Sequence, residues 1–244
     1  MKLNITCCLF VIDNIKSEYV KKNDEKILKV LVTKKDHKIF RVEFDNKTDI
    51  KTLLKKELSE VINTNKFHAE QVYTFGDSKF FGDNTIDIIY IAVAKINDIK
   101  KISDDYEFIP FVASTKKNIA LGEKEYNYDL IQVEENNKVK FYHNIKDISL
   151  TEEKNILEIL TAYKYLKSRI ANTSIIFNLL PEVFTLEDVR QTYELIREET
   201  VDKSNFRKKY SKYCKKIDIK VADKGYRPPQ LYTFNPEASK VFYR

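Results

Sequence analysis

The hydrophobic pattern changes its period once along the chain, near Ser149, and this change constrains the fold more than any other feature. Before it, short stretches rich in β-branched and aromatic residues lie between Asp, Asn, Lys or Gly, with one helix predicted over Asp49–Ile62. After it, apolar residues recur every three or four positions, as on one face of a helix. The sequence therefore predicts an α+β fold with two domains, residues 1–148 and residues 149–244.

The strand-like stretches of the first domain share one composition and read ITCCLFVI, ILKVLVT, KIFRVEF, EQVYTFG, TIDIIYIAVAKI, YEFIPFV, YDLIQVE and KVKFYH. Between them, STKKNIALGEKE is predicted to be an exposed loop. A sheet with a single intervening helix is expected from this pattern.

Composition limits the class of protein. Of the 244 residues, 43% are hydrophobic and 33% charged, which excludes disordered and fibrous proteins. No apolar run approaches the ~18 residues that span a bilayer. The first stretch, ITCCLFVI, lacks the basic start of a signal peptide. We expect a soluble cytoplasmic protein with Cys7, Cys8 and Cys214 reduced.

Three helices are predicted in the second domain. The first covers SLTEEKNILEILTAYKYLKSRI, with Thr151 as its N-cap. The second begins at Thr185, with Asp188 three positions later as in a capping box. The third covers KSNFRKKYSKYCKK, with Asp202 as its N-cap. Two strand-like stretches, IDIKV and QLYTF, then flank ADKGYRPP, whose glycine and prolines favour a turn.

A helix, a turn, a basic helix and a hairpin, in this order, are typical of a winged helix-turn-helix domain. The third helix is predicted to bury one apolar face, formed by Phe206, Tyr210, Tyr213, Cys214 and Ile217. The segment Lys203–Arg227 contains 10 basic residues against two acidic ones, which indicates a polyanionic partner. A basic surface helix without a ligand is the alternative.

The DNA-binding hypothesis assigns two sets of residues. Groove contacts are predicted for Ser204, Asn205, Arg207 and Lys208. Phosphate or wing contacts are predicted for Lys209, Lys212, Lys224, Tyr226 and Arg227.

Three motifs of the second half, NLLPEVFTLEDVRQTYELI, VDKSNFRKKY and GYRPPQLYTFNP, resemble in order and spacing the Nudix-related transcriptional regulators of the NrtR family. The segments HAEQVYTFGD and IDIIYIAVAKI extend the resemblance into the first half. It implies a Nudix-like α/β/α sandwich with a mixed sheet, fused to a winged helix. It further implies a homodimeric repressor of NAD or related nucleotide metabolism that binds a double-stranded operator and senses a nucleotide such as ADP-ribose.

The Nudix motif itself is incomplete in this sequence. Aligned on KELSEVIN, the motif keeps Glu57 and Glu60, but Val61 replaces a glutamate, Asn63 a glycine and Thr48 the isolated glutamate. Hydrolysis in this fold needs several clustered carboxylates to hold Mg²⁺. We therefore expect no catalytic residues and no cofactor, with Mg²⁺ at Glu57 and Glu60 as a weaker alternative.

The effector hypothesis names Glu57, Arg41 and Phe75. On a helical projection Glu57 falls inside the apolar arc, where a carboxylate needs a partner. A salt bridge to a nearby basic residue such as Arg41 and a ligand or metal role both remain open. Phe75 begins FGDSKFFGDN, which could stack on a base or simply connect two strands.

Two other functions stay open. The first is a Nudix-type nucleotide (ADP-ribose) pyrophosphatase that uses Glu57, Glu60 and either Asp77 or Asp83. The second is a first domain that no longer senses a nucleotide and serves only for dimerisation.

Overall fold

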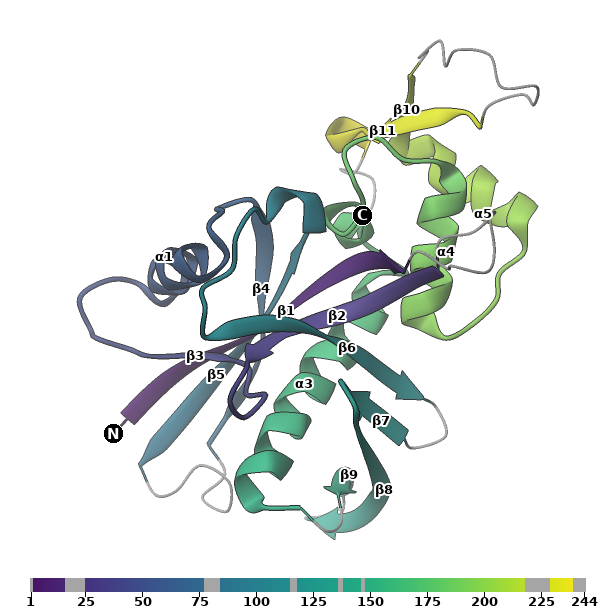
Figure 1. Ribbon diagram of the computed structural model, residues 1–244. Helices are drawn as coiled ribbons and strands as arrows, with labels where there is room; N and C mark the ends of the chain where they lie inside the picture. The colour runs from purple at the N-terminus through teal and green to yellow at the C-terminus, as the bar shows by residue number, and fades with distance from the viewer. Residues whose placement is uncertain are drawn as a thin grey trace.

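A mixed sheet forms the larger part of the protein (Figure 1). The computed structural model describes residues 2–15, 25–76, 84–114, 118–135, 138–145, 148–217 and 229–238. Within these ranges the sheet has nine strands, in the order β4-β5-β1-β2-β6-β7-β8-β9 with β3 beside β1. The strands are β1 Lys2–Ile15, β2 Glu25–Thr33, β3 Phe40–Glu43, β4 Phe67–Phe75, β5 Thr85–Ala94, β6 Tyr106–Ser114, β7 Asn118–Leu121, β8 Lys124–Glu135 and β9 Lys138–Ile145.

The parallel pairing of β1 with β5 makes the sheet mixed, because the other strand pairs are antiparallel. The remaining elements are α1 Ile50–Ile62, η1 Ile96–Asp98, α3 Leu150–Arg169, η2 Ser174–Asn178, α4 Leu186–Arg197, α5 Lys203–Tyr210, η3 Ser211–Tyr213, β10 Cys214–Ile217 and β11 Leu231–Phe234. The elements marked η are short 3₁₀ helices.

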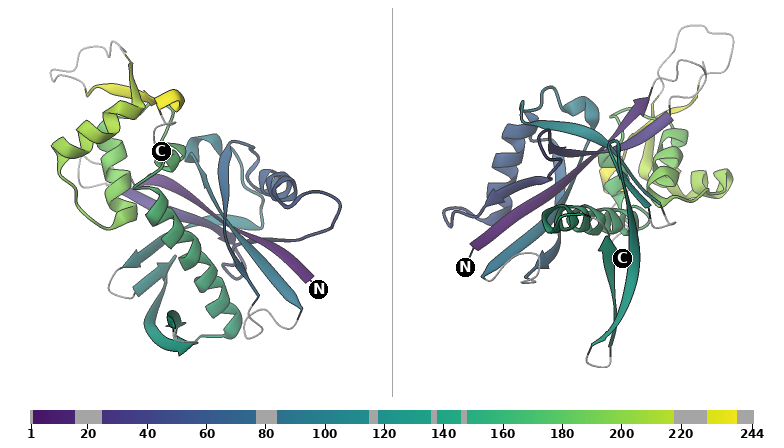
Figure 2. Two further views of the ribbon diagram at one scale, coloured as in Figure 1. Left: turned by 180° about the vertical axis from the view of Figure 1, so that it is seen from behind. Right: turned by 60° about the horizontal axis from the view of Figure 1, so that its bottom comes forward.

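Helices α1 and α3 cover opposite faces of the sheet (Figure 2). Alternate side chains of a strand point to opposite faces. In β1, Leu9 therefore packs in the core that contains Leu54 of α1, whereas Phe10 packs in the core that contains Tyr163 of α3. The predicted α/β/α sandwich with a mixed sheet is confirmed.

The core on the α3 side continues into the C-terminal region. It runs from β1, β2 and β6 through α3 and η2 to buried residues of α4 and α5. Helix α3 packs on β1, β4 and β5. The division at residues 148 and 149 stays a prediction, and these contacts favour counting α3 with the sheet.

Three local expectations were wrong. Ser149, not Thr151, is the N-cap of α3, since its side chain accepts from the backbone N–H of Glu152. The predicted loop STKKNIALGEKE contains β7, because its two large apolar residues, Ile119 and Leu121, alternate and are both buried.

The third expected helix is also shorter. It ends at Tyr210 and is followed by η3. Strand β10 then pairs with β11, from Cys214 opposite Phe234 to Ile217 opposite Leu231. The four residues Cys214–Ile217 have an apolar–polar–polar–apolar pattern that fits either a helix or a strand. Their hydrogen bonds to β11 stabilise the strand. In the described ranges, no helix is long and apolar enough to cross a membrane.

Candidate nucleic-acid interface

Helix α4 starts with the predicted capping box. The backbone N–H of Asp188 donates to Thr185 Oγ1 at 3.1 Å, and that of Thr185 donates to Asp188 Oδ2 at 2.9 Å. Lys26 Nζ on β2 lies 3.2 Å from Asp188 Oδ1. Burial would raise the pKa of Asp188, but these hydrogen bonds and the Lys26 charge lower it. The box therefore also ties α4 to the sheet.

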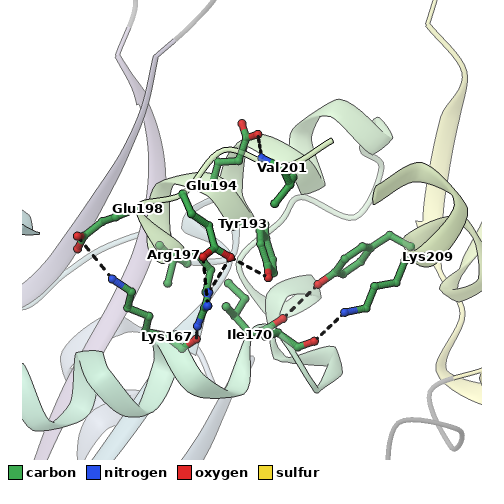
Figure 3. Close-up of polar contacts among 12 residues, drawn as sticks. Lys167, Ile170, Tyr193, Glu194, Arg197, Glu198, Val201 and Lys209 are labelled. Carbon is green, nitrogen blue, oxygen red and sulfur yellow. Dashed lines mark hydrogen bonds and ion pairs between the residues drawn. The ribbon is translucent and has the colours of Figure 1, made fainter. Parts of the chain in front are cut away.

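The turn between α4 and α5 is held by Glu194. Its Oε1 accepts from the backbone N–H of Val201 at 2.9 Å (Figure 3). Its Oε2 accepts from the guanidinium of Arg190. Arg190 also bonds Glu187 one turn earlier. Asp202 then caps α5, accepting from the N–H of Asn205 at 2.8 Å, as the sequence predicts. The start of α5 is thus fixed relative to α4.

Two aromatic residues anchor α5. The rings of Phe206 and Tyr210 stack with centroids 4.2 Å apart, and the ring of Tyr193 on α4 meets Phe206 edge-on at 5.4 Å. The Tyr210 hydroxyl donates to the carbonyl of Ile170 at 3.3 Å, and burial raises its pKa. The predicted apolar face of α5 is therefore correct for Phe206 and Tyr210, while Cys214 and Ile217 belong to β10.

The surface opposite these rings is polar and basic. It exposes Ser204, Asn205, Arg207 and Lys208. Lys212 is exposed on η3, and the exposed Lys215 and Lys216 of β10 add basic residues that the predicted site omits. The predicted third helix included Lys215 and Lys216, whereas in the structure α5 ends at Tyr210 and both lysines lie on β10. The sequence therefore showed their charge but placed them on the wrong element.

Lys209 lies differently. Its ammonium donates to the carbonyl of Ala171 at 3.1 Å, after the end of α3, and sits 5.6 Å from the ring centroid of Tyr210 (Figure 3). This contact competes with the predicted phosphate contact. The other predicted wing residues, Lys224, Tyr226 and Arg227, lie outside the described residues.

The wing is attached to the segment that precedes α4. Phe234 of β11 stacks on Phe177 of η2 with centroids 4.4 Å apart. The backbones of Phe184 and Tyr232 exchange two hydrogen bonds, at 2.8 and 3.0 Å. Any displacement of residues 177–184 would therefore move the strand of the wing directly.

On the sheet domain, Glu57 and Arg41 line one pocket of about 310 Å³ beside α1, as the effector hypothesis requires. However, they do not pair. Glu57 is half-buried, with its side chain 32% exposed, and its Oε1 lies 3.2 Å from Lys56 Nζ. Phe75 does not line this pocket, and its ring instead meets that of Tyr73 at 4.7 Å.

Although Arg41 lines this pocket, its guanidinium binds carboxylates on the face of the sheet that α3 covers. Its guanidinium bonds both carboxylate oxygens of Glu158 on α3, at 2.9 and 3.1 Å, and the buried Asp87 on β5. Lys154 Nζ and Asn4 Nδ2 also contact Asp87, at 2.7 and 2.6 Å. Burial would raise the pKa of Asp87, but these three partners lower it. The cluster joins α3 to the sheet.

The residues beside α1 give little support to the alternative that Glu57 and Glu60 bind Mg²⁺. Beside α1, the pocket offers two carboxylates, Glu57 and Glu60, and Val61 also lines it. The described ranges contain no group of three or more His, Cys, Asp or Glu able to hold a metal ion. Asp77 and Asp83, the further ligands of the pyrophosphatase hypothesis, lie outside those ranges.

Comparison with known proteins identifies the C-terminal region. Residues 176–234 match the family described as the NrtR DNA-binding winged helix domain. This region resembles an NrtR winged helix. The match begins in η2 and ends with β11, so it contains α4, α5 and both strands of the wing.

Solved NrtR structures share the fold of the whole chain. Shewanella oneidensis NrtR is 15% identical with a TM-score of 0.66, covering 98% of this chain and 96% of that one. The same protein complexed with a 27mer DNA is 16% identical with a TM-score of 0.62, covering 98% and 95%. A MutT/nudix family protein from Enterococcus faecalis is 16% identical with a TM-score of 0.63, covering 96% and 86%. A comparison with curated proteins gave no match.

The resemblance to NrtR-type regulators is confirmed, and with it the prediction of a DNA-binding regulator. The individual DNA contacts, the effector and the homodimer remain predictions.

Proposed function

We propose that this protein is a cytoplasmic homodimeric repressor that binds a DNA operator through α5 and the wing. Its sheet domain senses a nucleotide such as ADP-ribose without hydrolysing it. The observation that carries the DNA part is the division of α5. Phe206 and Tyr210 are buried against α4 and α3, while the opposite face exposes a serine, an asparagine and basic residues. A recognition helix needs these two faces.

The assignment of roles follows the chemistry of each side chain. Ser204 and Asn205 at the start of α5 can exchange hydrogen bonds with base edges. Arg207 and Lys208 follow them, and Lys212 extends the basic surface beyond the helix. Since phosphate contacts fix position and base contacts fix sequence, these two sets should respond differently to substitution.

The experiment measures binding of a labelled duplex from the region upstream of the gene, by fluorescence anisotropy at several salt concentrations. We expect log K to fall linearly with log salt, and Arg207→Ala to reduce the slope by about 0.9 if it contacts one phosphate. Asn205→Ala should narrow the difference in affinity between the specific duplex and a scrambled one. Lys55→Ala, on the exposed side of α1, serves as the matched control.

Binding without salt dependence, or an equal loss for Arg207→Ala and Lys55→Ala, would contradict the assignment of α5 as the DNA-binding helix.

The sensing role without hydrolysis is supported by the replacements around α1. Mg²⁺ requires near-octahedral oxygen coordination, and the pocket offers only Glu57 and Glu60 among the described residues, with Glu57 already paired to Lys56.

The alternative function, a nucleotide pyrophosphatase, is favoured by the similarity to a MutT/nudix family protein. Incubation with ADP-ribose and Mg²⁺ separates the two. Turnover that Glu57→Gln abolishes would establish the enzyme, whereas intact ADP-ribose in the presence of a competent DNA-binding protein supports the regulator.

A further inference from the structure

A cleft of about 280 Å³ lies between α4 and α5, and exposed residues of α5 form one of its walls. Helix α4 contributes Leu186, Glu187 and Arg190, and α5 contributes Lys203, Phe206 and Arg207. Leu186 and Phe206 are buried, so they give the cleft an apolar floor, and the other four side chains are charged. An apolar floor with charged walls suits the sugar-phosphate backbone of DNA, which offers an apolar sugar beside an anionic phosphate.

The charged residues of the cleft sum to a net positive charge, since Glu187 is the one anion among three cations. Arg190 is already bound, with its Nε 3.0 Å from Glu187 Oε2 and a second carboxylate, that of Glu194, on its Nη1. Lys203 and Arg207 are exposed, and neither forms an ion pair with a residue that the structure describes. These two cations are therefore available to an anion that comes from outside the protein.

Lys203 stands where a cation does not stabilise its own helix. It is the first residue of α5, after the cap Asp202, and the N-terminus of a helix carries a partial positive charge. Helix α4 follows the usual preference, with Glu187 and Asp188 in its first turn, whereas the first turn of α5 contains no acidic residue. Helix stability does not explain the charge of Lys203, and an anionic partner at the cleft does.

Glu187 limits how strongly the cleft attracts an anion. Its side chain is 49% exposed. The hydrogen bond from Arg190 lowers the pKa of this carboxyl, burial opposes the change, and the charges of Lys203 and Arg207 lower the pKa further. A phosphate that enters the cleft meets this negative charge as well as the two available cations, so Glu187 weakens the attraction without reversing it.

From these observations we propose that the cleft between α4 and α5 holds one backbone phosphate of the bound DNA, with Lys203 and Arg207 as its ligands and Glu187 as the residue that moderates the contact. The proposal rests on the proposed function, since it concerns the same DNA surface, and it adds α4 to that surface. A phosphate carries no sequence information, so Lys203 and Glu187 set affinity and position on the duplex for every sequence alike.

The first experiment measures binding of the specific and the scrambled duplex by fluorescence anisotropy at several salt concentrations. Lys203→Gln should weaken both ~10-fold, the effect of one lost charged hydrogen bond, and should reduce the salt slope by about 0.9. Lys55→Gln, the same change on the exposed side of α1, should bind as wild type does. Glu187→Gln should strengthen binding to both duplexes about 2–5-fold, the effect of one exposed ion pair, whereas Glu60→Gln, exposed on α1, should not.

Thermal unfolding of the same variants separates a DNA-binding role of Lys203 from a structural one. Lys203→Gln removes a cation from the N-terminus of α5, so it should melt at the wild-type temperature or slightly above it. A lower melting temperature that accompanies the loss of DNA affinity would assign Lys203 a structural role and overturn the proposal.

The second experiment locates the phosphate. Wild type and Lys203→Gln are each titrated with duplexes that carry one uncharged methylphosphonate, placed at a different phosphate in each duplex. At one position wild type should lose ~10-fold in affinity and Lys203→Gln much less, because both changes remove the same contact.

Two outcomes would count against the proposal and leave the proposed function intact. In the first, Lys203→Gln loses as much affinity as wild type at every methylphosphonate position. In the second, it binds the unmodified duplex as tightly as Lys55→Gln does. If wild-type protein binds neither duplex, the proposal and the proposed DNA-binding function are both wrong.

Discussion

Glu70 on β4 is the group whose removal most directly tests how α3 is held. Its carboxylate accepts from the Tyr165 hydroxyl at 2.6 Å and from two nitrogens of Arg169 at 3.2 Å, and His68 Nε2 lies 2.7 Å away. Tyr165 and Arg169 belong to the last turns of α3, just before the chain enters the winged helix. Glu70→Gln keeps the shape of the side chain and removes its charge.

The magnitude follows from the pKa of Glu70. Burial would raise this pKa, but hydrogen bonds from Tyr165, His68 and Arg169 lower it from 4.5 to about 2. A depressed folded-state pKa contributes stability that is complete above the unfolded value and is lost as pH falls through the folded value. The shift corresponds to about 3 kcal/mol at neutral pH, at ~1.4 kcal/mol per pKa unit.

The assay is thermal unfolding of wild type, Glu70→Gln and Glu60→Gln, an exposed glutamate of α1, between pH 7 and pH 2. At pH 7 Glu70→Gln should melt about 6–12 °C below wild type, from ~2–4 °C per kcal/mol in a chain of this size. The difference should shrink below pH 4.5 and vanish near pH 2, and Glu60→Gln should follow wild type throughout. A melting difference that stays constant with pH would refute the reasoning, because the lost stability would then not come from the ionised carboxylate.

Three further substitutions separate structural from DNA-binding roles. Lys209→Ala should cost about 1 kcal/mol in urea unfolding, since its ammonium bonds a carbonyl, and should leave the salt slope of DNA binding unchanged; a slope lower by about 0.9 would return Lys209 to the DNA surface. Thr185→Ala should cost about 1 kcal/mol by removing the N-cap of α4, which urea unfolding measures against Thr64→Ala in a loop. Arg41→Met should destabilise the fold by about 3–5 kcal/mol, because it leaves two buried carboxylates without their shared cation, and a loss below 1 kcal/mol would show that Lys154 balances both.

Local chemistry in the sequence was enough to predict much of the fold. The capping box at Thr185 and Asp188, the cap at Asp202 and the buried pair Phe206 and Tyr210 all follow from interactions within a few residues of one another. Hydrogen bonds of this range depend on the local sequence, so a pattern can predict them.

Contacts between distant residues were not predictable in this way. Arg41 and Glu158 are 117 positions apart, and no spacing rule connects them. The end of α5 depends on β11, whose strand pairing replaces a helical turn that the apolar spacing equally allowed. Lys209 shows the same limit for the site, because its charge indicated DNA and its place on α5 turned it toward Ala171.

Helix α3 contacts both the sheet and the helices α4 and α5 directly. In its first half, Asn155 accepts from the backbone N–H of Ile39 at 3.0 Å. At its other end, two backbone carbonyls accept hydrogen bonds from α4 and α5 (Figure 3). The carbonyl of Lys167 lies 3.2 Å from Arg197 on α4, and that of Ile170 lies 3.3 Å from the Tyr210 hydroxyl on α5.

Because packed helices and ion clusters of this kind resist gradual deformation, α3 fixes α4 and α5 relative to the sheet. The η2–α4 segment is the second connection, and it holds the wing by one aromatic contact, Phe177 with Phe234, and one backbone pair, Phe184 with Tyr232. A signal from the sheet can therefore move the wing while α5 stays in place. The wing and α5 would then no longer fit one DNA surface together, so a small shift of the η2–α4 segment would lower the affinity for DNA.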